Sequence, residues 1–476
     1  MAIAIIVTIA QILGVISSIS ALLTTRTSQG AIAWIVSLNT FPYLAVPAYW
    51  IFGRSRFNGY VESRKKVDRQ LQGRFPEIRL SVEQHLHLHD RNKLEQGQIE
   101  AVERIAKIPF TRGNEVVILQ GGEQAFERIF RELKDAQSYV LVQFYIVRAD
   151  RIGQEMKEAL LACAQRGVRV HFLYDEIGSY QLPREYVREL RRGGVEIVPF
   201  SSTRGFRNRF QINFRNHRKV LVVDGRVGFI GGLNLGDEYL GRSARFGPWR
   251  DTHLLISGPA LVGLQLPFLE DWHWATGQYL PLDWSTPAAF SRAGGHVALV
   301  LPSGPADEVG TAGLMVQHAI HSARERLWIA SPYFVPDEGV QDALKLAVLR
   351  GVDVRILIPD RPDHLLVFFS AFAFLRPMIH AGVKIYRYLP GFLHQKVFLV
   401  DRQVAGIGTV NLDNRSFRLN FEITAIILGE RIAREVEQMF EKDFMDSRMM
   451  ESADLETMPI RLKVVSRIAY LFAPIQ

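Results

Sequence analysis

The chain has 476 residues, enough for about three domains, so it is neither a short peptide nor, with 48% hydrophobic residues, an unstructured polymer. Its 57 Lys and Arg exceed its 49 Asp and Glu, and the net charge of +8 favours an anionic partner, either nucleic acid or an acidic membrane surface. The single cysteine, Cys163, excludes an internal disulfide. Because Cys163 lies in an apolar helical pattern, we expect it in the core rather than in catalysis.

Two long uncharged segments open the chain. Neither residues 1–25 nor residues 27–53 contain a charged side chain, and each can form a membrane-spanning helix of about 20 residues. The short link around Arg26 predicts an antiparallel two-helix transmembrane hairpin. A cleaved signal peptide is disfavoured, because no basic residue precedes the apolar run. Pro42 and Pro47 should kink the second segment, which leaves a re-entrant hairpin as an alternative.

Basic residues predict the orientation of this hairpin. The link between the helices offers Arg26 alone, whereas the segment after the second helix is strongly basic, and positive charge tends to stay inside. We therefore expect both chain ends, and all of the chain beyond about residue 54, in the cytoplasm. The basic residues after the hairpin are Arg54, Arg56, Arg64, Lys65, Lys66 and Arg69.

Residues 54–115 form a basic, polar segment that we interpret as a juxtamembrane connector. Three alternating histidines, His85, His87 and His89, could share one face of a strand and bind a metal. No cysteine or carboxylate pattern completes such a site, so we expect a solvated linker and no metal.

An internal repeat follows the connector. The string NHRKVLVVDGRVGFIGGLN (216–234) reappears as LHQKVFLVDRQVAGIGTVN (393–411), and AQRGVRVHFLYD upstream of the first is echoed by VLRGVDVRILIPD upstream of the second. The chain therefore contains two copies of one domain. The matched motif residues, each 177 positions apart, are His217 and His394, Lys219 and Lys396, Asp224 and Asp401, and Asn234 and Asn411.

Helices alternate with continuous apolar strands in each copy, which predicts α/β domains with mixed sheets covered on both faces. We expect the two tandem domains to pack face to face with pseudo-twofold symmetry. The predicted units are the transmembrane hairpin (1–53), the connector (54–115), the first α/β domain (116–283), the second α/β domain (284–447) and a C-terminal tail (448–476).

The residue types of the repeated motif suit a phosphodiester. His and Lys lie two apart on a predicted strand and so share a face, and the Gly-rich end lets backbone approach a bound group while an Asn offers a donor. The cationic and amide groups of two copies can neutralise a five-coordinate transition state without a metal. One imidazole, neutral, can attack phosphorus, while the other protonates the leaving alkoxide.

The motif H-x-K-x4-D-x6-G-G/T-x-N, present twice, resembles that of the phospholipase D superfamily. The wider chain is similar to bacterial cardiolipin synthases with an N-terminal membrane hairpin, through AWIVSL, NFRNHRKVLVVDG, WRDTHL, SPYFVP and GTVNLDNRSFRLNFEI. The resemblance implies transfer of a phosphatidyl group from one phosphatidylglycerol to another at the bacterial inner membrane, giving cardiolipin and glycerol. It implies anionic membrane lipids as partners, no nucleic acid and no cofactor.

The resemblance also implies roles for the motif residues. His217 would be the nucleophile that forms a phosphohistidine, and His394 the general acid and base, although the pseudo-symmetry leaves the reverse open. Asp224 and Asp401 belong to the named motif but end its strands, which favours a structural role. The groups that would hold the phosphate are Lys219, Lys396, Asn234 and Asn411.

Two downstream carboxylates are candidate partners of the histidines, because a carboxylate on the second ring nitrogen fixes the tautomer. Similarity to the superfamily implies crossed pairing of Asp251 with His394 and of Glu422 with His217. The alternative is that both are ordinary surface carboxylates.

Other segments suit an anionic lipid substrate. The apolar run 365–375 could line an acyl groove, dip into the bilayer or be a buried helix, and Arg215 and Arg218 could bind a headgroup or pair with local acids. In the tail, a basic amphipathic helix should dock on anionic lipid. Its apolar face comprises Ile460, Val464, Ile468, Leu471 and Phe472, and its basic residues are Arg461, Lys463 and Arg467.

Three other functions are alternatives to phosphatidyl transfer. A hydrolase would use the same phosphohistidine with water as acceptor. A nuclease of the same fold would need no membrane anchor, and its binding would weaken steeply with salt. A catalytically inactive scaffold is disfavoured, because both motifs are complete.

Overall fold

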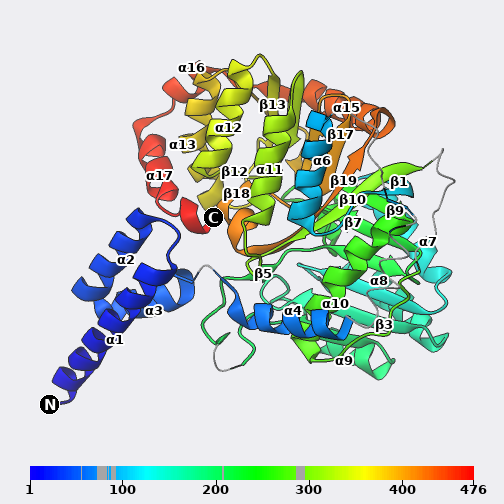
Figure 1. Ribbon diagram of the computed structural model, residues 1–476, viewed down its shortest axis with the longest axis horizontal. Coiled ribbons are helices and arrows are strands. Elements are labelled where there is room, and N and C mark those ends of the chain that lie inside the picture. The colour runs from blue at the N-terminus through cyan, green and yellow to red at the C-terminus, as the bar shows by residue number, and fades with distance from the viewer. Residues whose placement is uncertain (55, 72–82, 84, 87–92, 206–207, 286–294) are drawn as a thin grey trace.

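The computed structural model describes residues 1–54, 56–71, 83, 85–86, 93–205, 208–285 and 295–476. Figure 1 shows a two-part α/β body from which the N-terminal helices project. Of the three alternating histidines that could bind a metal, His87 and His89 lie outside the described residues.

The N-terminal projection consists of α1 (Ala2–Thr24), α2 (Ser28–Thr40) and α3 (Pro42–Phe52). Among the described residues, α1 is the one helix long and apolar enough to cross a membrane. The second apolar segment is split where Phe41 leaves the helical region (φ −131°, ψ 57°), because Pro42 has no N–H to continue the helix. The expected pair of spanning helices is thus corrected to one spanning helix followed by a helix–turn–helix.

The segment predicted as a connector is built into the body. Its first helix, α4 (Asn58–Leu71), packs against α10 (Val262–Thr276), and α6 (Lys93–Ala106) packs against α11 (Thr311–Ser322). Buried hydrogen bonds and ion pairs fix α4: the Tyr60 hydroxyl donates to Asp271 at 2.6 Å, and Arg64 pairs with Glu270 at 3.0 Å. One connector helix therefore covers each half of the molecule.

The two halves contain equivalent strands, as the repeat predicts, and these strands join into one extended mixed sheet. The strand order is β4-β3-β2-β6-β7-β9-β1 in the first half and β14-β13-β11-β16-β17-β19-β10 in the second, and β1 joins β10 in an irregular antiparallel pair. Strands β2, β3 and β4 of the first half are parallel to one another, as are β11, β13 and β14 of the second. The other neighbours in these two orders are antiparallel. An additional strand, β20, pairs with β14, and short strands flank the sheet.

The strand bounds of the first half are β1 Thr111–Gln120, β2 Tyr139–Phe144, β3 Arg169–Asp175, β4 Glu196–Phe200, β5 Arg215–Asn216, β6 Val220–Val223, β7 Val227–Gly231, β8 Trp249–Arg250 and β9 Thr252–Ser257. Those of the second half are β10 His296–Ser303, β11 Arg326–Ala330, β12 Phe334–Val335, β13 Asp353–Pro359, β14 Lys384–Tyr388, β15 Phe392–Leu393, β16 Val397–Val400, β17 Val404–Gly408, β18 Leu412–Asp413, β19 Asn420–Leu428 and β20 Ser447–Met449. The remaining α-helices are α7 Gly122–Lys134, α8 Arg151–Gln165, α9 Arg184–Arg192, α12 Glu338–Leu349, α13 Leu365–His380, α14 Asn414–Arg418, α15 Glu430–Met445, α16 Ser452–Glu456 and α17 Ile460–Tyr470.

The repeated Arg-Gly-Val strings mark the same turn in both halves. Gly167 follows α8 with φ +84°, and Gly351 follows α12 with φ +87°. Glycine adopts this left-handed conformation without the steric cost of a Cβ, so it ends the helix and turns the chain into the next buried strand.

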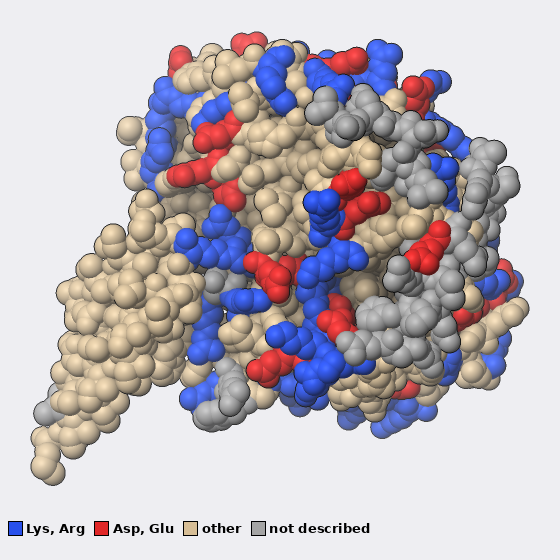
Figure 2. Space-filling view, in the orientation of Figure 1, with Lys and Arg blue, Asp and Glu red and all other residues tan. Residues whose placement is uncertain are grey.

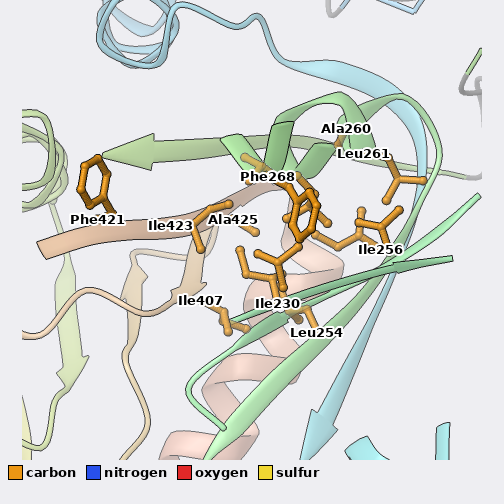
Figure 3. Packing of buried hydrophobic residues seen from close by; sticks show 14 of the residues in the cluster. Ile230, Leu254, Ile256, Ala260, Leu261, Phe268, Ile407, Phe421, Ile423 and Ala425 are labelled. Carbon is orange, nitrogen blue, oxygen red and sulfur yellow. The ribbon is translucent and has the colours of Figure 1, made fainter. Parts of the chain in front are cut away.

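The largest core cluster includes residues of both halves. Figure 3 shows Ile230, Leu254 and Ile256 of the first half close to Ile407 and Ile423 of the second, and all five are buried. Packing across this junction fixes the two halves relative to each other. Cys163 is also fully buried, with its Sγ donating to the carbonyl of Leu133 at 3.2 Å, as expected for a core residue.

Arg218 is a buried link between the halves and does not bind a headgroup, in contrast to one of the two sequence-based alternatives. It is fully buried and pairs with Asp271 at 2.9 Å. Its other guanidinium nitrogens donate to the carbonyls of Glu422 and Ser303 in the second half, at 3.1 and 3.2 Å.

We expect Arg218→Met to lower the melting temperature in detergent, because a buried carboxylate left without its partner costs about 3–5 kcal/mol. The matched control is Arg402→Met, whose side chain is largely exposed and should leave the melting temperature unchanged. Equal melting temperatures for the two variants would contradict the assigned role of Arg218.

Candidate active site

Two short strand pairs between the halves place the motif histidines. Strand β5 pairs in parallel with the start of β19, and β15 pairs in parallel with β8. Directly after these strands, the N–H of His217 donates to the carbonyl of Phe421 at 2.9 Å, and that of His394 donates to the carbonyl of Arg250 at 2.8 Å. The backbone of each half therefore positions the histidine of the other.

Each histidine also bonds to a carboxylate of the opposite half. The Nδ1 atom of His217 lies 2.8 Å from Oε2 of Glu422, and that of His394 lies 2.8 Å from Oδ2 of Asp251. Both carboxylates are fully buried and directly follow the residues that bind the histidine backbone. An ionised carboxylate at Nδ1 holds the proton there and leaves the Nε2 lone pair for chemistry.

Burial keeps both imidazoles neutral in the unliganded site. It lowers the pKa of His217 to about 4, assisted by the positive charge of Lys219 and opposed by Glu422. Burial and the charge of Lys396 likewise lower the pKa of His394 to about 4, against the pull of Asp251. A neutral imidazole is a nucleophile, whereas the general acid must take up a proton after an anionic phosphate enters the site.

The motif lysines are buried beside the histidines. The Nζ atom of Lys219 donates to the carbonyl of His217 at 2.7 Å, and that of Lys396 donates to the carbonyl of His394. Burial lowers the pKa of Lys219 well below its usual range, to which the Lys396 ammonium contributes, and burial lowers the pKa of Lys396 to about 8. The charge of Lys396 also lowers the pKa of His217, and that of Lys219 lowers the pKa of His394, so both motifs share one electropositive site.

The two carboxylates stay ionised despite their burial. Desolvation alone would raise the pKa of Glu422, but His217 and Lys219 outweigh it and lower the pKa. For Asp251, His394 and Lys396 outweigh desolvation in the same way and lower the pKa. Negative charge is therefore available to stabilise an imidazolium when one forms.

The motif aspartates lie at the opposite ends of the motif strands from the histidines. The Asp224 carboxylate accepts hydrogen bonds from the backbone N–H groups of three consecutive residues, 137–139, at 2.7–2.9 Å. Asp401 accepts from the equivalent residues 324–326. Both aspartates have φ +52° and tie the end of a motif strand to the start of β2 or β11, so the structure does not bring them to the histidines.

The two motif asparagines differ in their surroundings. Oδ1 of Asn234 accepts from the N–H of Ile146 at 3.1 Å, and its Nδ2 donates to the Tyr239 hydroxyl at 2.9 Å. Asn411 is buried, and within the described part of the chain its Oδ1 has no hydrogen-bond partner. The pseudo-symmetry of the site is therefore imperfect at this position.

Aromatic residues that the motif analysis did not single out flank the histidines. The ring of Tyr145 lies 5.0 Å from that of His217, while Trp249 lies 5.2 Å and Tyr239 6.2 Å from His394. In sequence, Tyr145-Ile146-Val147 is echoed by Tyr333-Phe334-Val335 of the second repeat, so aligning the repeats beyond the motif would have found Tyr145. Trp249 lies in the string WRDTHL, whereas no comparable sequence signal points to Tyr239.

Comparison with known proteins agrees with this geometry. The family profile described as "Cardiolipin synthase, PLD-like domain" matches residues 129–244 and 316–444. The chain is 48% identical over 467 residues to cardiolipin synthase A of Pseudomonas aeruginosa, covering 98% of this chain and 94% of that protein. The chain belongs to the cardiolipin synthase family. Members of this family are phosphatidyltransferases with phospholipase D-like domains. This chain is therefore a phosphatidyltransferase.

Two further comparisons support the family and the fold. Cardiolipin synthase A of Pseudomonas putida is 46% identical over 465 residues, covering 98% of this chain and 96% of that protein. The crystal structure of phosphatidylserine synthase from Haemophilus influenzae matches 80% of this chain and 100% of its own, with a TM-score of 0.61 and 15% identity. That similarity shows a shared fold.

The pH dependence of kcat/KM should reflect these buried groups. We expect a fall below about pH 4, where His217 becomes protonated, and above about pH 8, where Lys396 loses its charge. Lys396→Arg keeps the charge and should move the alkaline limb to higher pH. An acid limb at the ordinary histidine pKa of 6.5, or an alkaline limb unmoved by Lys396→Arg, would contradict the electrostatics described above.

Asp401→Ala should destabilise the fold more than it impairs the chemistry. Three exposed or part-buried backbone N–H groups would lose their acceptor, at a cost of about 0.5–1.5 kcal/mol for each hydrogen bond. The expected result is a lower melting temperature with kcat, measured below it, largely retained. An unchanged melting temperature with abolished kcat would instead indicate a chemical role.

Proposed function

We propose that the chain joins two phosphatidylglycerol molecules into cardiolipin with release of glycerol. Nε2 of His217 attacks the phosphorus of the donor, the bond from phosphorus to the glycerol oxygen breaks, and His394 protonates the departing glycerol. His394 then takes the proton of the terminal hydroxyl of a second phosphatidylglycerol. That oxygen attacks the phosphohistidine, which forms the new phosphodiester and releases His217.

The observation that carries this proposal is the crossed pair of histidine–carboxylate contacts, both 2.8 Å long. They give the site two imidazoles of fixed tautomer, one to form a bond to phosphorus and one to transfer protons in both steps of a double displacement. Membership of the cardiolipin synthase family supports an alcohol rather than water as the second acceptor.

The remaining motif residues fit supporting roles. Lys219 and Lys396 are close enough to the histidines to neutralise the non-bridging phosphate oxygens, and burial strengthens that attraction. Asn411 adds a buried amide, whereas the Asn234 amide orients Tyr239. Asp224 and Asp401 hold the strands that carry the lysines and histidines.

The enzyme is proposed to act at the cytoplasmic face of the bacterial inner membrane, with α1 as its anchor. The tail (448–476) supports the surface position. Helix α17 packs against α13 through buried Ser466 and Ala469, and it leaves apolar side chains exposed for a membrane, as do Leu365 and Leu366 at the start of α13. Figure 1 places α17 on the side from which α1–α3 project. The exposed side chains of this C-terminal segment are Ile460, Val464, Val465, Ile468, Leu471 and Phe472.

Product analysis tests the reaction. With phosphatidylglycerol as the sole lipid in micelles, mass spectrometry should find cardiolipin and glycerol in equal amounts, because each transfer releases one glycerol. Phosphatidic acid as the main product would show that the chain is a hydrolase. Cleavage of DNA with no lipid product would show a nuclease.

Histidine variants test the order of the steps. A p-nitrophenyl ester serves as the phosphatidyl donor, because its leaving group needs little protonation. With this donor, His394→Ala should accumulate a phosphatidyl adduct on His217, since the variant is impaired only in deprotonating the acceptor. His217→Ala should form no adduct. An adduct on His394 in His217→Ala, and none in His394→Ala, would reverse the assignment.

A further inference from the structure

The helices of the N-terminal projection differ in length relative to the thickness of a bilayer. The 23 residues of α1 extend about 34 Å, enough for a hydrocarbon core of about 30 Å. The 13 residues of α2 and the 11 of α3 extend only about 20 and 16 Å. Neither short helix can cross a bilayer, although together they are longer than one span.

Helix α2 runs back along the C-terminal half of α1. A Cβ added to Gly14 would lie 2.3 Å from the carbonyl oxygen of Leu38, so the end of α2 is in close contact with the middle of α1. Nearby, Nδ2 of Asn39 donates to Oγ of Ser18 at 2.9 Å. Gly14 and Ser18 form the small-xxx-small spacing that permits close helix packing in membranes.

Helix α3 then returns along the same half of α1. Nε1 of Trp50 donates to Oγ of Ser17 at 3.3 Å, and the Tyr49 hydroxyl donates to Oγ of Ser20 at 2.9 Å. A continuous antiparallel helix would instead place residues 49 and 50 level with the N-terminal end of α1. The chain has therefore reversed direction at Phe41, level with the middle of α1.

Both ends of this helix–turn–helix lie at the catalytic body. The link between α1 and α2 carries Arg26, whose pKa is lowered by burial and by the positive charge of Arg418 in α14. At the end of α3, the ring of Trp50 lies 5.1 Å from that of Phe210, over which the Arg209 guanidinium stacks at 4.7 Å. Figure 1 shows the N-terminus of α1 at the opposite tip, farthest from the body.

The turn between α2 and α3 suits a hydrocarbon environment, where every polar backbone group needs a partner. The N–H of Phe41 donates to the carbonyl of Ser37 at 2.9 Å, and the carbonyl of Phe41 accepts from Ala45 at 2.9 Å. The Thr40 hydroxyl donates back to the helix that precedes it, and Pro42 has no N–H to satisfy.

Charge favours the same arrangement. In Figure 2 the projection carries no charged side chain along its visible surface, and Lys and Arg gather where it joins the body. A full two-helix hairpin would place Arg26 across the membrane from the basic residues after Gly53. If the second segment turns back, Arg26 and those residues share one side, as the positive-inside rule prefers.

We propose that α1 is the single span among the described residues, and that α2 and α3 form a re-entrant hairpin in the leaflet nearest the catalytic domains. The N-terminus then lies on the membrane side opposite those domains, the reverse of the expectation that both chain ends share the cytoplasm. Lipid acyl chains cover the exposed apolar faces of all three helices. The exposed side chains include Ile9, Ile16, Leu23, Ile32, Val36 and Leu44.

Cysteine labelling with a membrane-impermeant maleimide tests the sidedness. The full-length wild-type chain is the blank, because its one cysteine, Cys163, is fully buried. Lys134→Cys, exposed on α7, marks the side of the catalytic domains. In intact spheroplasts Ala2→Cys should be labelled and Gln29→Cys protected. In inverted vesicles Gln29→Cys and Lys134→Cys should be labelled and Ala2→Cys protected. Gln29→Cys labelled from the side opposite Lys134→Cys, or all three labelled from one side, would overturn the proposal.

A matched pair of double variants tests the return of α3. A short bis-maleimide should link Ser20→Cys to Tyr49→Cys in membranes, which mass spectrometry of the peptides would detect. The control pair Ile6→Cys and Val46→Cys would be adjacent only in a continuous two-helix hairpin and should not link. A cross-link in the control pair alone, or in neither pair, would overturn the re-entrant arrangement. Cardiolipin formation by these variants reports separately on the proposed reaction.

Discussion

The hydrogen bond from each catalytic-motif histidine to a carboxylate of the other half is the contact on which the site depends. Glu422 holds His217, and Asp251 holds His394, through contacts that exist only when the halves are packed together. The short β5–β19 and β15–β8 pairs supply the backbone framework for these contacts. Neither half contains a complete histidine–carboxylate unit, so the chemistry requires both copies of the repeat in one chain.

Burial gives this arrangement its electrostatic character. Removing water lowers the pKa of both histidines and both lysines, and the site therefore holds less positive charge at rest than its composition indicates. An entering phosphate anion reverses this balance, because it favours the protonated form of whichever group it contacts. The ionised carboxylates then stabilise the imidazolium that forms. Substrate binding and proton uptake are in this way coupled without a metal in the proposed mechanism.

The sequence predicted the α/β class, the mixed sheet, the tandem repeat and the motif residues, because each depends on local pattern. The alternation of helices with apolar strands, the Arg-Gly-Val strings at Gly167 and Gly351 and the exact repeat of His-x-Lys are visible in the chain itself. Other features depend on residues far apart in sequence. The segment 54–115 was interpreted as a polar connector, and its helices α4 and α6 pack against helices of the body. For α4, Tyr60 and Arg64 find their partners about 210 positions away.

The N-terminal region shows where sequence and tertiary structure divide. Hydropathy by itself determined that residues 1–53 are apolar enough for a membrane, and Pro42 indicated a break in the second segment. Only the packing of α3 against Ser17 and Ser20 decided that the chain turns back, because helix direction after a break depends on side-chain contacts. Side-chain contacts also distinguish the motif histidine from the motif aspartate. Sequence identified His217 and Asp224 as one motif, and tertiary structure decided that the histidine bonds to Glu422 of the other half while the aspartate binds the backbone at the other end of the strand.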